Sequence, residues 1–156
     1  MKNRENVYKI TSIILMLDQF IKLIVTRNLN LYEEVKIIPK FFSILYVKNT
    51  GAAFSILKDS SFLLIILSVI FVLLLDNYIK KEKHLSLEQV ISFGLIMGGI
   101  FGNLMDRIIH HSVIDYLSFT FGKYYFPIFN LADTAIVCGV ILYGISIILE
   151  KKERLK

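Results

Sequence analysis

The stretch SFLLIILSVIFVLLL, residues 61–75, contains no charged side chain. From Phe62 onward it belongs to an apolar segment of about residues 62–79, which is long enough for one helix to cross a bilayer. Three further segments meet the same length requirement, at residues 8–25, 87–109 and 129–149. The sequence therefore predicts an all-α integral membrane fold, a bundle of four transmembrane helices.

The composition of the whole chain agrees with this fold class. The 156 residues are 55% hydrophobic and the mean hydropathy is +0.62, with much of the apolar content in long blocks. One membrane domain covering residues 1–156 is expected. The formal net charge of +5 comes from basic residues at segment ends rather than a stripe interleaved with aromatics, so no nucleic acid partner is expected. The single cysteine, Cys138, excludes an intramolecular disulfide and is expected to be a packing residue.

Basic residues set the expected orientation in the membrane. One cluster precedes the first span, one fills the link between the second and third spans, and one follows the fourth. An even number of spans places all three clusters on one side, which predicts cytoplasmic termini and outward-facing loops at residues 28–61 and 110–128. The clusters are Lys2, Arg4 and Lys9; Lys80, Lys81 and Lys83; and Lys151, Lys152, Arg154 and Lys156.

The first outward loop is expected to fold rather than to serve as a linker. FFSILYV, residues 41–47, is rich in β-branched and aromatic residues and follows Pro39, which predicts a strand. KNTGAAFS, residues 48–55, then predicts a polar turn. A small extracytoplasmic β element over about residues 35–58, resting on the membrane surface, is the expected result.

Glycines recur in the third span. Gly94, Gly98 and Gly102 are spaced by four, with Gly99 beside them. Small residues at this spacing let helix backbones approach closely, which predicts tight packing of this helix in the bundle.

Ionisable residues within the predicted spans indicate a functional site, because a charge at the bilayer centre costs roughly 2.5–3.5 kcal/mol on insertion scales. Asp18 and Lys22 are four apart, and Asn103, Asp106 and Arg107 are spaced i, i+3, i+4, so each set shares a helical face. The simplest interpretation is two structural ion pairs, Asp18–Lys22 and Asp106–Arg107. Arg107 could also face a ligand.

Two carboxylates then have no obvious cationic partner. Asp115 lies in the connecting segment HHSVIDYLSF, residues 110–119, and Asp133 shares a face with Asn130 at the outer start of the last span. Two carboxyls within hydrogen-bond reach cannot both ionise, so one retains a proton. The charged member can take a proton from water while the protonated member polarises a scissile carbonyl, which is the chemistry of an aspartyl protease.

Other protease chemistries lack their sequence signatures. The chain has no His-Glu-x-x-His helix and no Gly-x-Ser-x-Gly elbow. His110 and His111 are adjacent, so their side chains point in different directions and are poorly placed to bind one metal ion. No metal site is expected.

Five short motifs, in this order, resemble those of the lipoprotein signal peptidases, also called signal peptidase II. They are LDQFIK (17–22), NTGAAFS (49–55), GNLMDRI (102–108), VIDYLSF (113–119) and FPIFNLADTAI (126–136). The family comprises bacterial membrane aspartyl endopeptidases. They cleave signal peptides from prolipoproteins whose cysteine carries a diacylglyceryl group, cutting just before that cysteine.

The resemblance implies the same reaction here, in the bacterial cytoplasmic membrane with the active site toward the outer face. The implied partners are a prolipoprotein substrate and membrane lipid, with no cofactor and a monomeric chain. Asp115 and Asp133 match the catalytic pair, and Asn49 and Arg107 match residues that face the substrate or an inhibitor. The remaining supporting positions are Asp18, Lys22, Gly51, Asn103, Asp106, Asn130 and Ala132.

A small proton-coupled transporter is the alternative from another functional class, because buried carboxylates can relay protons. A transporter predicts charged groups at many depths, whereas here they lie toward one side and the second span has none in its core. A purely structural subunit would leave Asp115 and Asp133 unexplained.

Overall fold

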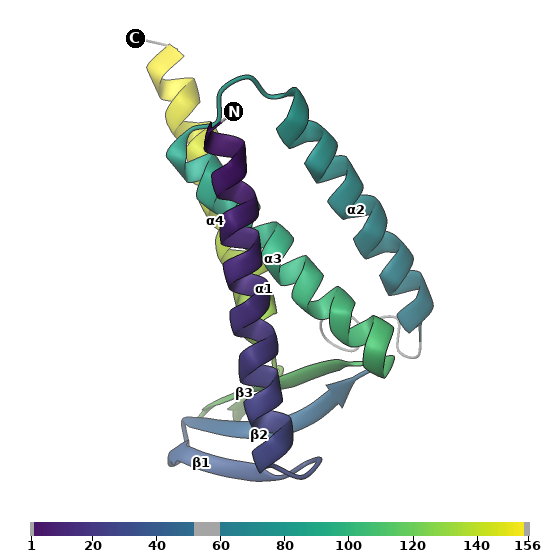
Figure 1. Ribbon diagram of the computed structural model, residues 1–156. Coiled ribbons are helices and arrows are strands. Elements are labelled where there is room, and N and C mark those ends of the chain that lie inside the picture. Colours follow the sequence, from purple (N-terminus) through teal and green to yellow (C-terminus); the bar gives the residue numbers. More distant parts are fainter. Residues whose placement is uncertain (1, 52–59, 155–156) are drawn as a thin grey trace.

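Four long helices and one small antiparallel sheet make up the computed structural model, which describes residues 2–51 and 60–154. Figure 1 shows the helices side by side, with the sheet across one end of them. In chain order the elements are α1 (Lys2–Asn28), β1 (Glu34–Ile38), β2 (Phe42–Asn49), α2 (Ser61–Lys81), α3 (Leu87–His110), β3 (Val113–Phe121), β4 (Tyr124–Tyr125) and α4 (Leu131–Arg154).

Three of the helices are long and apolar enough to cross a membrane: α2, α3, and the Leu131–Leu149 part of α4. The remaining long helix, α1, is more polar because it carries Lys9, Asp18 and Lys22. The fold is thus mostly helical with a small antiparallel sheet. The part of the predicted β element beyond residue 51 lies outside the described residues.

Glycines let α3 approach both α1 and α4 closely, as their spacing predicts. A methyl group added at Gly94 or Gly98 would lie 2.6 Å from the Cβ atom of Ile10 or Ile14 on α1. One added at Gly99 would collide with the backbone oxygen of Ala132 on α4. Side chains larger than hydrogen would therefore force the helices apart.

Large side chains instead separate α2 from α3. Val72 and Ile79 of α2 are buried in one apolar cluster with Phe93 and Met97 of α3. The opposite face of α2 is exposed and apolar, which suits contact with lipid. Figure 1 shows α2 on the outer side of the helices, at the right of the view.

Asp76 links α2 to α1: its Oδ1 accepts a hydrogen bond from the Tyr8 hydroxyl at 2.7 Å, and its Oδ2 lies 2.6 Å from Lys80 Nζ. One prediction about a single residue is wrong. Cys138 is exposed on the outer surface of α4 rather than packed in the core, because α4 presents Gly139 to α3 instead.

The sheet has the order β1-β2-β3-β4, with neighbouring strands antiparallel. The predicted strand at residues 41–47 is present within β2. The segment of residues 110–119 is not merely a connection, because most of it forms β3, which pairs with β2. Its β-branched and aromatic residues favour this pairing, and the polar Asp115 obscures the pattern in the sequence.

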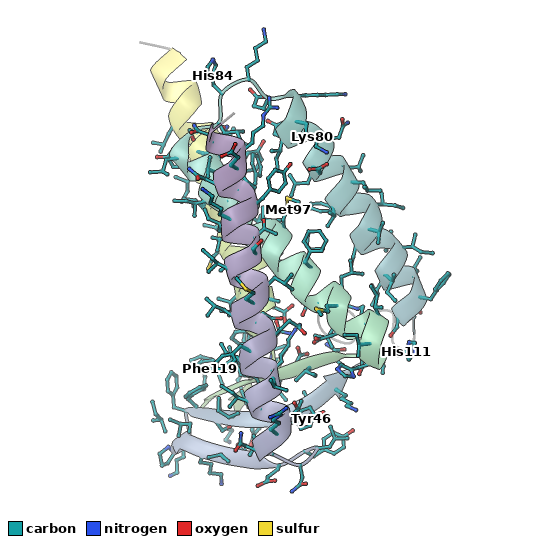
Figure 2. The ribbon with its side chains drawn as sticks, in the orientation of Figure 1. Tyr46, Lys80, His84, Met97, His111 and Phe119 are labelled. Carbon is teal, nitrogen blue, oxygen red and sulfur yellow. The ribbon has the colours of Figure 1, made fainter. Side chains whose placement is uncertain are left out.

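The contact between α1 and the sheet forms a second apolar core. Val25 of α1 is buried together with Tyr46, Ile114 and Tyr116. In Figure 2, Tyr46 and Phe119 lie at the sheet end of the molecule, and Lys80 and His84 lie at the opposite end. This packing holds β3 against the helix ends, where the polar residues gather.

Candidate active site

A capping box opens α4 and orients Asp133. Asn130 Oδ1 accepts the backbone N–H of Asp133 at 2.9 Å, and Asp133 Oδ2 accepts the backbone N–H of Asn130 at 3.2 Å. The two residues are three apart at a helix start, where this reciprocal arrangement satisfies donors that have no partner within the helix. The helix accordingly begins at Leu131 rather than at residue 129.

Other elements hold the same helix start. The backbone N–H of Leu131 donates to the Tyr116 hydroxyl at 3.2 Å, and that of Ala132 donates to Asp18 Oδ1 at 3.0 Å. Burial raises the pKa of Tyr116, so this hydroxyl remains neutral. The first turn of α4 is thus fastened to β3 and α1, which fixes the position of Asp133.

Asp115 lies on β3 and is only 2% exposed. Its Oδ1 accepts a hydrogen bond from Asn130 Nδ2 at 2.7 Å, and its Oδ2 accepts one from Asn49 Nδ2 at 3.0 Å. Burial, reinforced by the charge of Asp133, raises the pKa of Asp115 to about 7, although the two amides lower it. Asp115 is therefore a carboxyl that can hold a proton near neutral pH.

Asn130 links the two carboxylates. Its side chain donates to Asp115 Oδ1, and its backbone N–H donates to Asp133 Oδ2. Asn103 on α3 completes the link, since its Nδ2 donates to Asp133 Oδ1 at 2.7 Å and its Oδ1 accepts from Asn130 Nδ2 at 3.1 Å. The structure thus brings Asp115, Asp133, Asn103, Asn130 and Asn49 into one hydrogen-bonded group.

A buried ion cluster lies behind this group. Lys22 Nζ is 2.8 Å from Asp18 Oδ2 and 2.8 Å from Asp106 Oδ2, and it donates to Asn103 Oδ1 at 3.1 Å. Lys22, Asp18 and Asp106 are each at most 1% exposed. Buried charges persist only when they are paired and hydrogen-bonded, and the three polar contacts of the ammonium meet that need. The predicted Asp18–Lys22 pair is confirmed.

The predicted Asp106–Arg107 ion pair is wrong. Adjacent residues on a helix point in different directions, so Asp106 meets Lys22 from α1 instead. The guanidinium of Arg107 donates to the backbone oxygens of Gly51 at 3.1 Å and Asn103 at 3.4 Å. Among the described residues, nothing accepts a hydrogen bond from Arg107 Nε, although the side chain is buried.

Sequence reasoning missed two supporting residues. Gln19 Nε2 donates to Asp106 Oδ1 at 2.9 Å and to the backbone oxygen of Gly102 at 3.1 Å. The Tyr116 hydroxyl accepts a hydrogen bond from the backbone N–H of Leu131. Gln19 could have been found, because it is an uncharged polar residue beside Asp18 in an apolar segment. Tyr116 has no comparable signal, since its neighbours are apolar apart from Asp115.

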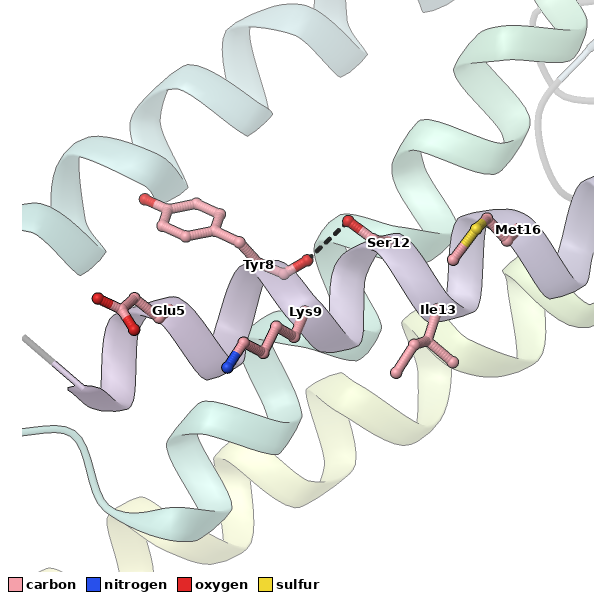
Figure 3. Close-up of a pocket in the computed structure, with 6 residues that line it drawn as sticks. All are labelled: Glu5, Tyr8, Lys9, Ser12, Ile13 and Met16. Atoms are coloured by element: carbon pink, nitrogen blue, oxygen red, sulfur yellow. Dashed lines mark hydrogen bonds between the residues drawn. The ribbon is translucent and has the colours of Figure 1, made fainter.

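A hollow on the surface of α1 lies away from this group. Figure 3 shows that it is lined by Glu5, Tyr8, Lys9, Ser12, Ile13 and Met16, none of which contacts the two carboxylates.

The described residues offer no metal site. Within residues 2–51 and 60–154, no three His, Cys, Asp or Glu side chains are grouped so that they could hold a metal ion.

Comparison with known proteins places this arrangement in a family. Two solved structures described as bacterial membrane enzymes superpose with TM-scores of 0.87 and 0.81 at 28% and 29% identity. The first alignment covers 94% of this chain and 90% of the other, and the second covers 90% and 91%.

The sequence relatives carry a more specific name. A lipoprotein signal peptidase of Listeria monocytogenes serotype 4a (strain HCC23) is 35% identical over 94% of this chain and 95% of its own length. One from Shewanella oneidensis is 37% identical over 86% of this chain and 81% of its own length. The profile of the family described as signal peptidase (SPase) II matches residues 10–149. The chain belongs to the signal peptidase II family.

Proposed function

We propose that this chain is an aspartic endopeptidase that removes signal peptides from prolipoproteins. The observation that carries the proposal is the Asn130 side chain, which is hydrogen-bonded to Asp115 and to the backbone of Asp133. The backbone N–H of Asn130 donates to Asp133 Oδ2 as well, so one residue holds both carboxylates at one place. Family membership supplies the reaction class.

The proposed reaction uses one proton shared by the pair. The ionised carboxylate takes a proton from water, and the resulting hydroxide adds to the scissile carbonyl carbon. The protonated carboxyl hydrogen-bonds the carbonyl oxygen and then gives its proton to the departing amine as the C–N bond breaks. A pKa of about 7 suits Asp115 to either role, so the assignment of the base stays open.

The surrounding residues are proposed to serve substrate binding and positioning. Arg107 has a buried Nε without a partner among the described residues and lies beside the Gly51 backbone, which supports a contact with substrate. Asn49 holds Asp115 and is the second proposed substrate-facing residue. Asp115 and Asp133 are positioned by Asn103, Asp106 and Asn130. The Asp18–Lys22 ion pair supports these three residues structurally.

The proposed setting is one membrane domain of residues 1–156 with four transmembrane helices and an extracytoplasmic sheet. Exposed apolar residues of α1, including Met16 at 62% and Phe20 at 59%, support its inclusion among the spans. The basic end of α2 lies opposite the sheet in Figure 2, which supports cytoplasmic termini and an outward site in the bacterial cytoplasmic membrane. The chain would act as a monomer in contact with membrane lipid.

The substrate proposed is a prolipoprotein with a diacylglyceryl-modified cysteine, cut just before that cysteine. Carboxylates at a helix start near the membrane surface suit such a substrate, because its lipid remains in the bilayer while the peptide bond reaches water. The transporter alternative finds no support, since the relatives are named lipoprotein signal peptidases and the buried carboxylates gather at one end of the helices.

A cleavage assay on a lipid-modified prolipoprotein tests the proposal. Asp115→Asn and Asp133→Asn should each lower turnover by about 10³-fold, within the range for general acid–base catalysis. Asp76→Asn is the matched control, because Asp76 lies outside the site, and it should retain turnover. Near-normal activity of either site variant, once correctly inserted, contradicts the aspartic mechanism. Loss of wild-type activity on adding a metal chelator contradicts it equally.

A further inference from the structure

Two hairpin tips of the sheet lie side by side and resemble each other. The first, between β1 and β2, contains Lys40 and Phe41, and the second, between β3 and β4, contains Gly122 and Lys123 after Phe121. Lys40 and Gly122 both have positive φ, at 62° and 64°. The Phe41 and Phe121 rings are 5.7 Å apart in an edge-on arrangement. Each tip therefore presents a lysine beside an aromatic ring.

The contacts between the tips form one exposed aromatic surface, named here the hairpin-tip patch. The backbone of the first tip accepts a hydrogen bond from the N–H of Thr120 at 2.9 Å, and β4 pairs with the end of β3. The exposed fractions of its rings range from 41% to 59%. The patch consists of Lys40, Phe41, Phe121, Lys123, Tyr124 and Phe126. Tyr124 pairs with Phe121 and shares its face, whereas Tyr125 pairs with Thr120 and points to the opposite face of the sheet.

The core of the sheet does not require this exposure. Phe42 stacks on Phe119 at 4.8 Å between ring centroids, and Phe119 stacks on Phe129 at 5.8 Å. These inward rings already pack β2 and β3 together. An exposed group of contiguous large aromatic side chains indicates an interaction surface.

The position of the patch favours a membrane as its occupant. Figure 1 shows the ends of the strands projecting past α1, and Figure 2 shows Phe119 at that projecting end on the side facing the helices. The lower part of α1 exposes Phe20, Leu23 and Ile24 at 45–59%, so apolar helix surface continues toward the sheet. The patch is thus continuous with the surface that faces lipid.

The chemistry of the patch matches the headgroup region of a bilayer. Tyrosine rings concentrate at membrane interfaces because they are apolar with one polar end. Lysines near an anionic membrane surface each contribute roughly 1 kcal/mol of attraction. We propose that the hairpin-tip patch enters the interface of the nearest leaflet, with its rings among the headgroups and Lys40 and Lys123 on anionic lipid phosphates.

The absence of tryptophan from the chain permits a clean test. Tyr124→Trp places one indole in the patch, where the native ring is 59% exposed, and Tyr32→Trp is a matched control outside it, at 71%. Each variant is reconstituted in vesicles of phosphatidylcholine and phosphatidylglycerol. Phospholipids brominated near the top of the acyl chain should quench fluorescence from position 124 at least twofold more than from position 32, and aqueous iodide should show the reverse preference.

Two results overturn the proposal. One is equal quenching of both positions by iodide with no preference for brominated lipid. The other is protection of position 124 from iodide without quenching by brominated lipid, which would show that protein, such as a second copy of this chain, covers the patch. Retained prolipoprotein cleavage by each variant shows that it is folded.

The lysines are tested in the Tyr124→Trp background. Lys40→Gln with Lys123→Gln should remove most of the increase in brominated-lipid quenching that accompanies added phosphatidylglycerol. Lys36→Gln with Lys48→Gln, which changes two exposed lysines of the same sheet outside the patch, should preserve it. An unchanged response in the first variant overturns the role of the two lysines.

One consequence rests on the proposed function. Because β3 carries Asp115 near one end and joins the patch at the other, anchoring the tips would fix the depth of Asp115. The Lys40→Gln, Lys123→Gln variant should therefore cleave prolipoprotein about fivefold more slowly in anionic vesicles and at the wild-type rate in detergent micelles. Equal loss in both media overturns this consequence. If the wild-type chain fails to cleave prolipoprotein, only the proposed function is contradicted. The membrane contact of the patch is still tested, because the quenching measurement does not depend on catalytic activity.

Discussion

The ammonium of Lys22 lies 3.1 Å from Oδ1 of Asn103, and this contact sets the direction of the Asn103 amide. Asn130 Nδ2 donates to the same oxygen, so the amide nitrogen of Asn103 is left to donate to Asp133. A buried cation that touches neither Asp115 nor Asp133 therefore orients a hydrogen bond to one of them. Orientation by such neighbours is what keeps a site in a productive geometry.

Removal of the Lys22 charge should destabilise the fold strongly. Lys22→Met leaves Asp18 and Asp106 buried without a cation, and the expected loss is about 3–5 kcal/mol. Lys80→Met is the matched control, because it breaks another i, i+4 pair whose lysine is 63% exposed, and it should lose about 1 kcal/mol or less. Chemical unfolding in detergent measures both. Equal stability of the two variants would show that the buried cluster contributes no more than a surface pair.

Loss of the Asn130 side chain should affect activity more than a simple helix cap does. Asn130→Ala removes the cap of α4 and the hydrogen bond to Asp115, and turnover is expected to fall by about 10²-fold or more. Ser86 caps α3 with a similar box involving Gln89, away from the site, so Ser86→Ala should cost about 0.5–2 kcal/mol of stability at unchanged turnover. If the two variants have the same turnover, Asn130 is only a cap.

The pH profile of cleavage should have an alkaline limb that reports Asp115. Its pKa is raised from 3.8 to about 7, so above that range the pair loses its shared proton and the rate should fall. The Asn49 hydrogen bond lowers this pKa, so Asn49→Ala should move the limb to higher pH. Asn30→Ala, outside the site, should leave the limb in place. A limb shifted downward by Asn49→Ala would contradict the assignment.

The same group affects stability in a defined direction. Since the folded pKa of Asp115 lies above the unfolded value, its contribution to stability is fully present below pH 3.8 and is lost as the pH rises through about 7. Asp115→Asn cannot ionise, so this variant should lose less stability than the wild type between pH 5 and about 8. Unfolding midpoints across that range measure the difference, and parallel curves would contradict it.

Gly102 should not tolerate a methyl group. In Gly102→Ala the new carbon would collide with the Asp18 carboxylate and lie 3.3 Å from the Ala132 Cβ atom, so overpacking should cost about 1–3 kcal/mol and displace Asp18 from the start of α4. Gly144 has open space around it, and Gly144→Ala should stabilise its helix by about 0.5–1 kcal/mol. Thermal unfolding compares them, and activity should fall only for Gly102→Ala. A neutral Gly102→Ala would show that α1 and α3 can separate freely.

Local spacing predicts part of the candidate site correctly. Residues three or four apart on a helix share a face, and the contacts Asp18–Lys22 and Asn130–Asp133 both exist. The same reasoning fails for Asp106, whose partner comes from another helix. Spacing along one element carries no information on which side chain a different element brings nearest.

The apolar helices, the glycine face of α3, the strand in β2 and the resemblance that family membership confirms could all be predicted from the sequence. Each follows from composition or from a short-range pattern. Other contacts became visible only in the folded chain: Asn49 with Asp115, and Lys22 with Asp18, Asp106 and Asn103. The same holds for the places of Tyr116 and Gln19 in the network. These contacts depend on the register of β2 with β3 and on the close helix approach that glycine permits, and both are set by packing across the whole chain.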